Sequence, residues 1–84
     1  MRILKHEGGY VNAELIKSYG LREEIRGWTI CAYAPADEVL YTLGRSMSVE
    51  TARKRLAYLA EWLATNEHGL LDIMDICEED YWRG

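Results

Sequence analysis

The chain has 84 residues, of which 49% are hydrophobic and 29% are charged. This length fits one domain, residues 1–84, and is too short to enclose both a core and a large ligand cavity. The hydrophobic content excludes a disordered chain, no apolar run reaches the roughly 20 residues that span a bilayer, and the N-terminus lacks an apolar signal region. We therefore expect a soluble cytoplasmic protein without membrane contacts.

The net charge of −4 is concentrated at one end of the chain. Residues 1–70 contain nine acidic and nine basic residues, whereas residues 71–84 contain five acidic residues and a single arginine. A balanced body with an acidic end does not attract nucleic acid through its overall field, so we do not expect nucleic acid as a partner. The acidic segment, residues 70–84, is expected to form an electrostatic surface.

The first half of the chain, residues 1–44, predicts a meander of antiparallel strands. Four or five strands are expected, at residues 1–5, 10–12, 15–21, 28–34 and 39–43. The last two give the clearest signal, because apolar and polar residues alternate on each side of a break at Pro35. This pattern is typical of a β-hairpin.

Residues 48–67 predict an amphipathic helix that begins after an N-cap at Ser48 and ends before Gly69. Its core-facing positions recur at helical spacing, at Val49, Ala52, Leu56, Leu59, Ala60 and Leu63. Packed on the strands, this helix predicts an α+β fold with one antiparallel sheet of four to five strands. The following segment, residues 70–82, fits a short second helix, which we favour, or an edge strand.

Two aromatic residues of this helix, Tyr58 and Trp62, lie one turn apart, off the core-facing stripe and beside Arg55. Tyrosine, tryptophan and arginine are enriched at the energetic centres of protein interfaces. We expect these three residues to bind a partner protein, unless segment 70–82 of the same chain covers them. The nine aromatic residues of the chain also favour a partly apolar sheet face and therefore a two-fold homodimer.

Several strand motifs and one helix start follow each other along residues 1–65, in the order Tyr10-Val11-Asn12, Ile16, Trp28-x-Ile30-x-Ala32-Tyr33, Val39-x-Tyr41-x-Leu43 and Ser48-x-x-Thr51-Ala52. In this order they resemble small bacterial and phage proteins of unknown function, in which a meander of strands precedes one amphipathic helix. The resemblance rests on core positions and brings no catalytic residue. It therefore implies a fold and no activity.

A second resemblance concerns the helix alone, through the pattern Ser48-x-x-Thr51-Ala52-x-x-x-Leu56-x-x-Leu59. This pattern is similar to the recognition helix of helix-turn-helix and winged-helix DNA-binding proteins. It implies that residues 48–63 read DNA and that Arg53, Lys54 and Arg55 contact the groove or the phosphates. It also requires a helix at 36–43, where the residues alternate as in a strand, so it is kept as the alternative function.

The sequence shows no pattern for metal binding or catalysis. The possible zinc ligands His6, Cys31, His68 and Cys77 lack the closely spaced pairs of structural zinc sites. Cys31 lies in the middle of a predicted strand, which is a poor position for an accessible nucleophile. We therefore expect no metal, no cofactor and no enzymatic activity. The leading hypothesis is a non-enzymatic binding or regulatory protein that acts through protein–protein contacts.

Overall fold

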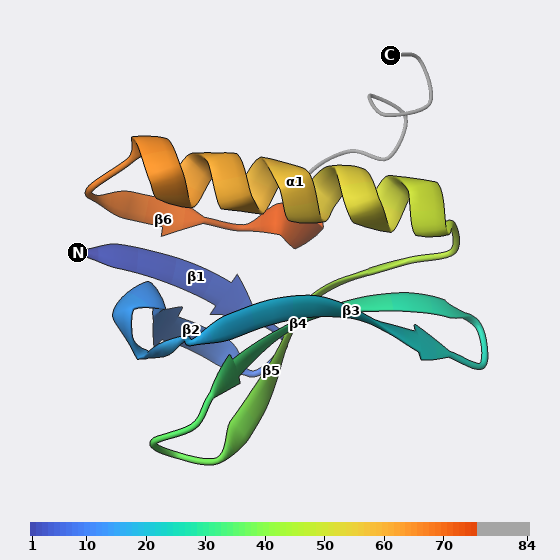
Figure 1. Ribbon diagram of the computed structural model, residues 1–84, viewed down its shortest axis with the longest axis horizontal. Helices are drawn as coiled ribbons and strands as arrows, with labels where there is room; N and C mark the ends of the chain where they lie inside the picture. Colours follow the sequence, from blue (N-terminus) through green and yellow to red (C-terminus); the bar gives the residue numbers. More distant parts are fainter. Residues whose placement is uncertain (76–84) are drawn as a thin grey trace.

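The computed structural model describes residues 1–75 and shows an α+β fold (Figure 1). Within these residues there are six strands, one α-helix and two short 3-10 helices. The strands are β1 (Arg2–His6), β2 (Gly9–Asn12), β3 (Ser18–Glu24), β4 (Gly27–Ala34), β5 (Val39–Ser46) and β6 (Gly69–Leu71). The helices are η1 (Ala13–Leu15), α1 (Val49–Thr65) and η2 (Ile73–Asp75).

The strands form two three-stranded sheets, so the prediction of a single sheet of four to five strands is wrong. One sheet has the order β3-β4-β5, and both of its pairings are antiparallel. In the other sheet, β1 pairs with β2 in the antiparallel direction and with β6 in the parallel direction. The parallel pairing joins the first and last strands of the described chain. Such a long-range contact cannot be predicted from a local sequence pattern.

Three contacts join the two sheets where β1 ends. The backbone N–H of Glu7 donates to the carbonyl of Thr42 on β5 at 3.0 Å. The carboxylate of Glu7 also pairs with Arg45, with 2.6 Å between Oε1 and Nε. The ring centroids of His6 and Tyr41 lie 4.5 Å apart. The turn between β1 and β2 is therefore held against β5.

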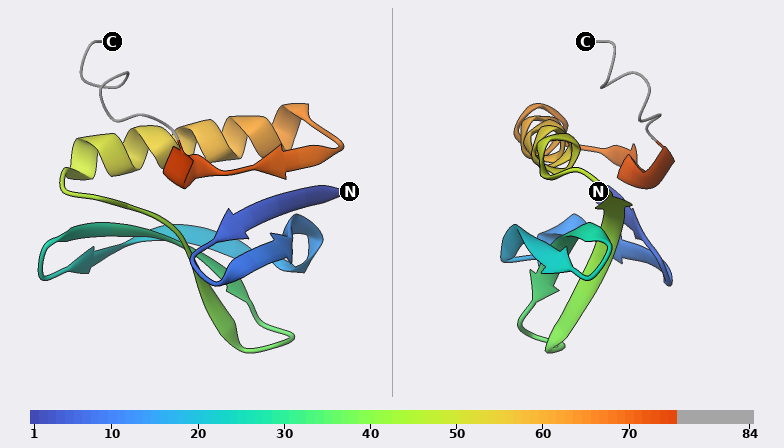
Figure 2. Two further views of the ribbon diagram at one scale, coloured as in Figure 1. Left: turned by 180° about the vertical axis from the view of Figure 1, so that it is seen from behind. Right: turned by 90° about the vertical axis from the view of Figure 1, so that its right-hand side faces the viewer.

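The hydrophobic core lies between α1 and the strands, and α1 contacts all three strands of the β3-β4-β5 sheet. Both views in Figure 2 place α1 on one side of the strands, with β6 running beside it. On β4, alternate residues face the core, as the predicted hairpin requires. The buried members of this core cluster are Leu4, Val11, Ala13, Ile16, Ile30, Ala32, Ala34, Leu43, Ala52, Leu59, Leu71 and Ile73.

The predicted start of α1 is confirmed, and its end differs by two residues from the prediction. The hydroxyl of Ser48 accepts from the backbone N–H groups of Glu50 at 3.2 Å and Thr51 at 3.4 Å. The helix ends at Thr65, because Asn66 takes an extended conformation and its N–H donates to the carbonyl of Trp62. Ser48 thus satisfies the first amide groups and Asn66 closes the last turn.

The buried face of α1 is shifted toward Trp62 relative to the predicted stripe. Thr51 and Arg55 are buried in addition to the expected Ala52 and Leu59, whereas Ala60 is exposed. On this shifted side, Arg55 is turned toward β5, where its Nη1 donates to the backbone carbonyl of Arg45 at 3.1 Å.

Two further segments depart from the prediction. The strand expected at 15–21 begins at Ser18, because residues 13–15 form η1, whose first turn is capped by Asn12 accepting from the Glu14 N–H at 2.9 Å. After α1, residues 69–71 form β6 and residues 73–75 form η2. The favoured second helix is therefore wrong for residues 70–75, where the edge-strand alternative holds in part. The remainder of segment 70–84 lies outside the described residues.

Candidate functional site

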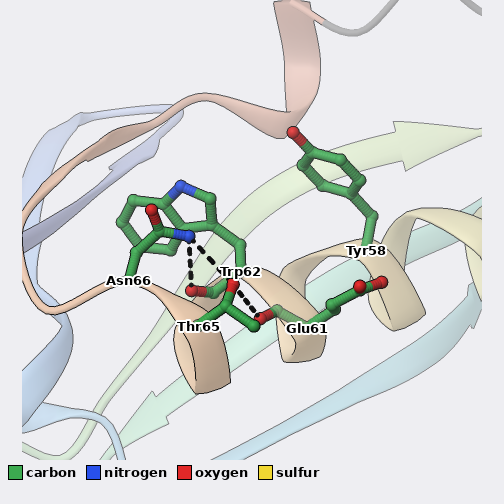
Figure 3. A pocket seen from close by; sticks show the side chains of 5 residues that line it. All are labelled: Tyr58, Glu61, Trp62, Thr65 and Asn66. Atoms are coloured by element: carbon green, nitrogen blue, oxygen red, sulfur yellow. Dashed lines mark hydrogen bonds between the residues drawn. The ribbon is translucent and has the colours of Figure 1, made fainter.

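A hollow of about 220 Å³ opens to solvent beside the last turns of α1 (Figure 3). It is lined by Tyr58, Glu61, Trp62, Thr65 and Asn66, and we call it the aromatic notch. These residues are spaced three and four apart, so they share one face of the helix. In Figure 3, Trp62 lies to the left and Tyr58 to the right, and Glu61 and Thr65 lie below the two rings.

The two aromatic side chains of the notch are held in different ways. The Trp62 ring is half-buried and packs against the core. A Cβ atom added to Gly69 of β6 would lie 3.4 Å from Cζ2 of Trp62, so the backbone of β6 covers one edge of the ring. Tyr58 is 47% exposed, and its hydroxyl points away from the helix (Figure 3). The notch thus has one supported wall and one accessible wall.

Side chains at the end of α1 form the polar floor of the notch. The hydroxyl of Thr65 donates to the carbonyl of Glu61 at 2.8 Å. The side-chain amide of Asn66 donates to the carbonyl of Trp62 at 3.0 Å and to the hydroxyl of Thr65 at 3.1 Å (Figure 3). Both carbonyl acceptors belong to the last turns of α1, so these bonds hold the side chains of Thr65 and Asn66 against the helix end. The floor is therefore fixed by local hydrogen bonds.

Arg55 does not lie in this surface, and its expected place there is corrected. The side chain is only 3% exposed, and its Nη1 donates to the backbone carbonyl of Arg45 on β5 at 3.1 Å. Because the helix is rotated toward Trp62, position 55 faces the strands instead of solvent. The structure thus brings Tyr58 and Trp62 together in the notch and places Arg55 between α1 and β5.

The three residues of the DNA-binding alternative do not form one surface either. Arg53 and Lys54 are exposed on α1, but Arg55 is buried. Arg53 lies 3.9 Å from the carboxylate of Glu50 on the previous turn. Residues 39–46 form β5, so the helix that a helix-turn-helix motif requires before α1 is missing from the described part of the chain.

Sequence reasoning identified Tyr58 and Trp62 but missed Glu61, Thr65 and Asn66. The signal was present in the spacing, because 58, 61, 62, 65 and 66 form a continuous row along a helix. The predicted apolar stripe covers one row of helix positions, whereas the notch is formed by a second row of mixed polar and aromatic character.

Two other surfaces carry exposed apolar groups. On the solvent face of the β2-β1-β6 sheet, Tyr10 and Leu70 are exposed, and Lys5 pairs with Asp72 at 3.5 Å. On the solvent face of the β3-β4-β5 sheet, Tyr33 and Leu40 border a hollow of about 250 Å³. These faces agree with the expectation of a partly apolar open sheet.

The titratable groups weighed as ligands or nucleophiles lie apart from one another. Within residues 1–75, no three histidine, cysteine or acidic side chains come together to hold a metal ion. Cys31 is buried, and this burial raises the pKa of its thiol, which disfavours the reactive thiolate. His6 accepts from the Gly8 N–H, and His68 lies 2.6 Å from the terminal amine. Cys77 lies outside the described residues.

Comparison of the chain with protein-family models, with curated protein sequences and with solved structures gives no significant match. Among residues 1–75, no helix combines the length and the apolar character needed to cross a membrane.

Proposed function

We propose that the protein is a cytoplasmic, non-enzymatic binding protein that acts through protein–protein contacts made at the aromatic notch. The observation that supports this proposal is the pair of large aromatic side chains, Tyr58 and Trp62, that flank an open hollow on α1. Burying such rings in an interface removes apolar surface from contact with water, which is favourable. These residue types dominate the binding energy of many interfaces.

The partner proposed first is a second copy of the chain, in a two-fold dimer. Support comes from the number of exposed apolar side chains in so small a domain, which include Tyr58 at the notch and Leu70 on the β2-β1-β6 sheet. The notch is the better contact site, because it is concave and one of its walls is already supported by β6. A preformed wall lowers the entropy lost on binding.

Sedimentation velocity over a wide range of concentrations tests this proposal. The wild type should show a concentration-dependent dimer, and Tyr58→Ala should remain a monomer while keeping the wild-type circular dichroism spectrum. Leu70→Ser is the matched control, because it removes an exposed apolar group away from the notch. It should dimerise like the wild type.

Each other outcome contradicts one part of this proposal. Dimers of Tyr58→Ala as stable as those of the wild type would exclude the notch as the contact site. Loss of the dimer in Leu70→Ser alone would place the interface on the β2-β1-β6 sheet. A wild type that stays monomeric at every concentration would exclude a second copy as the partner. An unfolded Tyr58→Ala would show that this ring belongs to the core.

A further inference from the structure

We infer that the aromatic notch binds a basic side chain, lysine or arginine, presented by the partner protein. This inference rests on the proposed function and specifies the chemistry of that contact. Three features of the notch favour a cation over an anion or a neutral group. They are the two aromatic faces, the carboxylate of Glu61 and the C-terminal end of α1.

Two aromatic rings line the notch, and Tyr58 is the more exposed of them. Tyr58 and Trp62 stand apart on the two sides of the hollow (Figure 3), unlike His6 and Tyr41, whose ring centroids lie 4.5 Å apart. The face of an aromatic ring carries negative potential and attracts an ammonium or guanidinium group that approaches within roughly 6 Å. A basic side chain entering the hollow would meet two such rings.

Glu61 adds a full negative charge at the same place. Its side chain is exposed, and it forms no ion pair within residues 1–75. Several other acidic residues are paired with basic side chains of the same chain, namely Glu7, Glu14, Glu24, Glu50 and Asp72. The carboxylate of Glu61 is therefore available to a basic group from outside.

The end of α1 contributes a partial negative charge. The carbonyl groups of a last helical turn point toward the C-terminus, where they favour cations. The last turn of α1 contains no basic residue. Arg2 does reach the carbonyl of Leu63, but its own charge is paired with Glu14 at 2.6 Å. The local field at the notch therefore favours a cation.

These features also disfavour the other ligand classes. An acidic side chain would meet the carboxylate of Glu61 and the negative helix end, so it would be repelled. A neutral apolar side chain would remove water from Glu61 without replacing the lost hydrogen bonds, which costs free energy. A lysine or arginine covers the rings with its aliphatic stem and pairs its charged end with Glu61.

Titration with short peptides tests the inference independently of dimer formation. The probes are acetyl-Gly-Lys-Gly-amide, its arginine equivalent and a norleucine equivalent that keeps the aliphatic chain without the charge. The readout is the indole N–H resonance of Trp62 in NMR spectra, assigned by its loss in Trp62→Phe. The spectra are recorded at a protein concentration at which sedimentation shows only monomer.

The two basic peptides should shift the Trp62 resonance saturably, and added salt should weaken their binding. The norleucine peptide should cause no comparable shift. Glu61→Gln should weaken the binding of the lysine peptide by about threefold to fivefold, as expected when one exposed ion pair is lost. Glu23→Gln is the matched control, because it removes the same charge from exposed β3 and should bind like the wild type.

Tyr58→Leu should also weaken binding, since it keeps an apolar side chain and removes one ring face. Equal shifts with the norleucine peptide, equal effects of Glu61→Gln and Glu23→Gln, or no shift with either basic peptide would each overturn the inference. A dimer lost in Tyr58→Ala together with failed peptide binding would leave the proposed function standing. Peptide binding by a permanent monomer would support the inference and identify the partner as a different protein.

Discussion

The two sheets of this protein are held together by different means. In β3-β4-β5, long strands that follow each other in the chain pair through short turns. In β2-β1-β6, the strands have three to five residues, and β6 follows α1 in the chain, far in sequence from β1. The β3-β4-β5 sheet, called the first sheet below, therefore depends on turn geometry. The β2-β1-β6 sheet, called the second sheet, depends on side chains that meet only after the chain has folded.

The largest expected effect concerns the turn between β3 and β4 in the first sheet, which ends at Gly27. Gly27 has a φ of +123°, and an added Cβ would lie 3.1 Å from the Cα of Met47 and closer still to the carbonyl oxygen of Ser46. Both neighbours are backbone atoms, which cannot turn aside as a side chain can. We expect Gly27→Ala to lower the free energy of unfolding by about 2–4 kcal/mol in urea denaturation.

Gly20 provides the matched control for this substitution. It lies in β3 of the same sheet, and no atom lies within 4 Å of the position of an added Cβ. Gly20→Ala should therefore change the free energy of unfolding by no more than about 0.5 kcal/mol. Similar losses in the two variants would show that strand glycines in general, and not the turn, control the first sheet.

The next effect concerns the long-range pairing of the second sheet. Leu71 of β6 lies opposite Leu4 of β1, and both side chains are in the core. Its neighbour Leu70 points the other way and is 56% exposed. Leu71→Ala should lower the free energy of unfolding by about 2–3 kcal/mol, measured by chemical denaturation. Leu70→Ala should change it by less than about 0.5 kcal/mol.

This pair of variants separates two arrangements of the segment after α1. In a strand, adjacent residues point to opposite faces, so the two leucines must differ strongly. Comparable losses in both variants would contradict the placement of β6 beside β1. A large loss at Leu70 and a small one at Leu71 would indicate a register shifted by one residue.

The same contrast explains which parts of the fold could be predicted from the sequence. The β4–β5 hairpin and the cap at Ser48 were predicted correctly, because each depends on residues close together in the chain. The split into two sheets was missed, since it depends on the pairing of β1 with β6. Alternation in a three-residue strand is too short to be told from a helical pattern.

The candidate site was predictable to a similar extent. Tyr58 and Trp62 were recognised from helical spacing alone, and the structure places both beside one hollow. Arg55 was misplaced, because its burial depends on the carbonyl of Arg45 on β5, a tertiary contact. An arginine on a helix is ordinarily exposed, so the sequence contained no sign that this one turns inward.

A smaller effect tests how α1 stabilises the first sheet, whose three strands it contacts. Ser48→Ala removes the side chain that accepts from Glu50 and Thr51. The expected loss is about 1 kcal/mol in the free energy of unfolding, with faster amide hydrogen exchange in the first turn of α1. Ser18→Ala, at the exposed start of β3, should have little effect. Equal losses in both would contradict the capping role.

The smallest expected effect concerns the ion pair that joins the two sheets. The guanidinium of Arg45 donates hydrogen bonds to Glu7 and holds the pKa of this carboxyl below that of an ordinary glutamate. The folded chain therefore binds fewer protons at Glu7 than the unfolded chain, so the pair stabilises the fold above the ordinary pKa of roughly 4.3. This stabilisation is lost as the pH falls below that value.

Thermal unfolding of the wild type and Glu7→Gln from pH 7 to pH 3 measures this contribution. The variant should melt slightly lower at pH 7, and the difference should shrink as the pH falls toward 3. The difference is small because both side chains are largely exposed and water screens their attraction.

Glu14 also has a lowered pKa, caused by Arg2, but it is present in both proteins and cancels in the comparison. A difference that stayed constant down to pH 3 would mean that the glutamine disturbs the β1–β2 turn, and that the backbone bond from Glu7 to Thr42 joins the sheets without help from the charge.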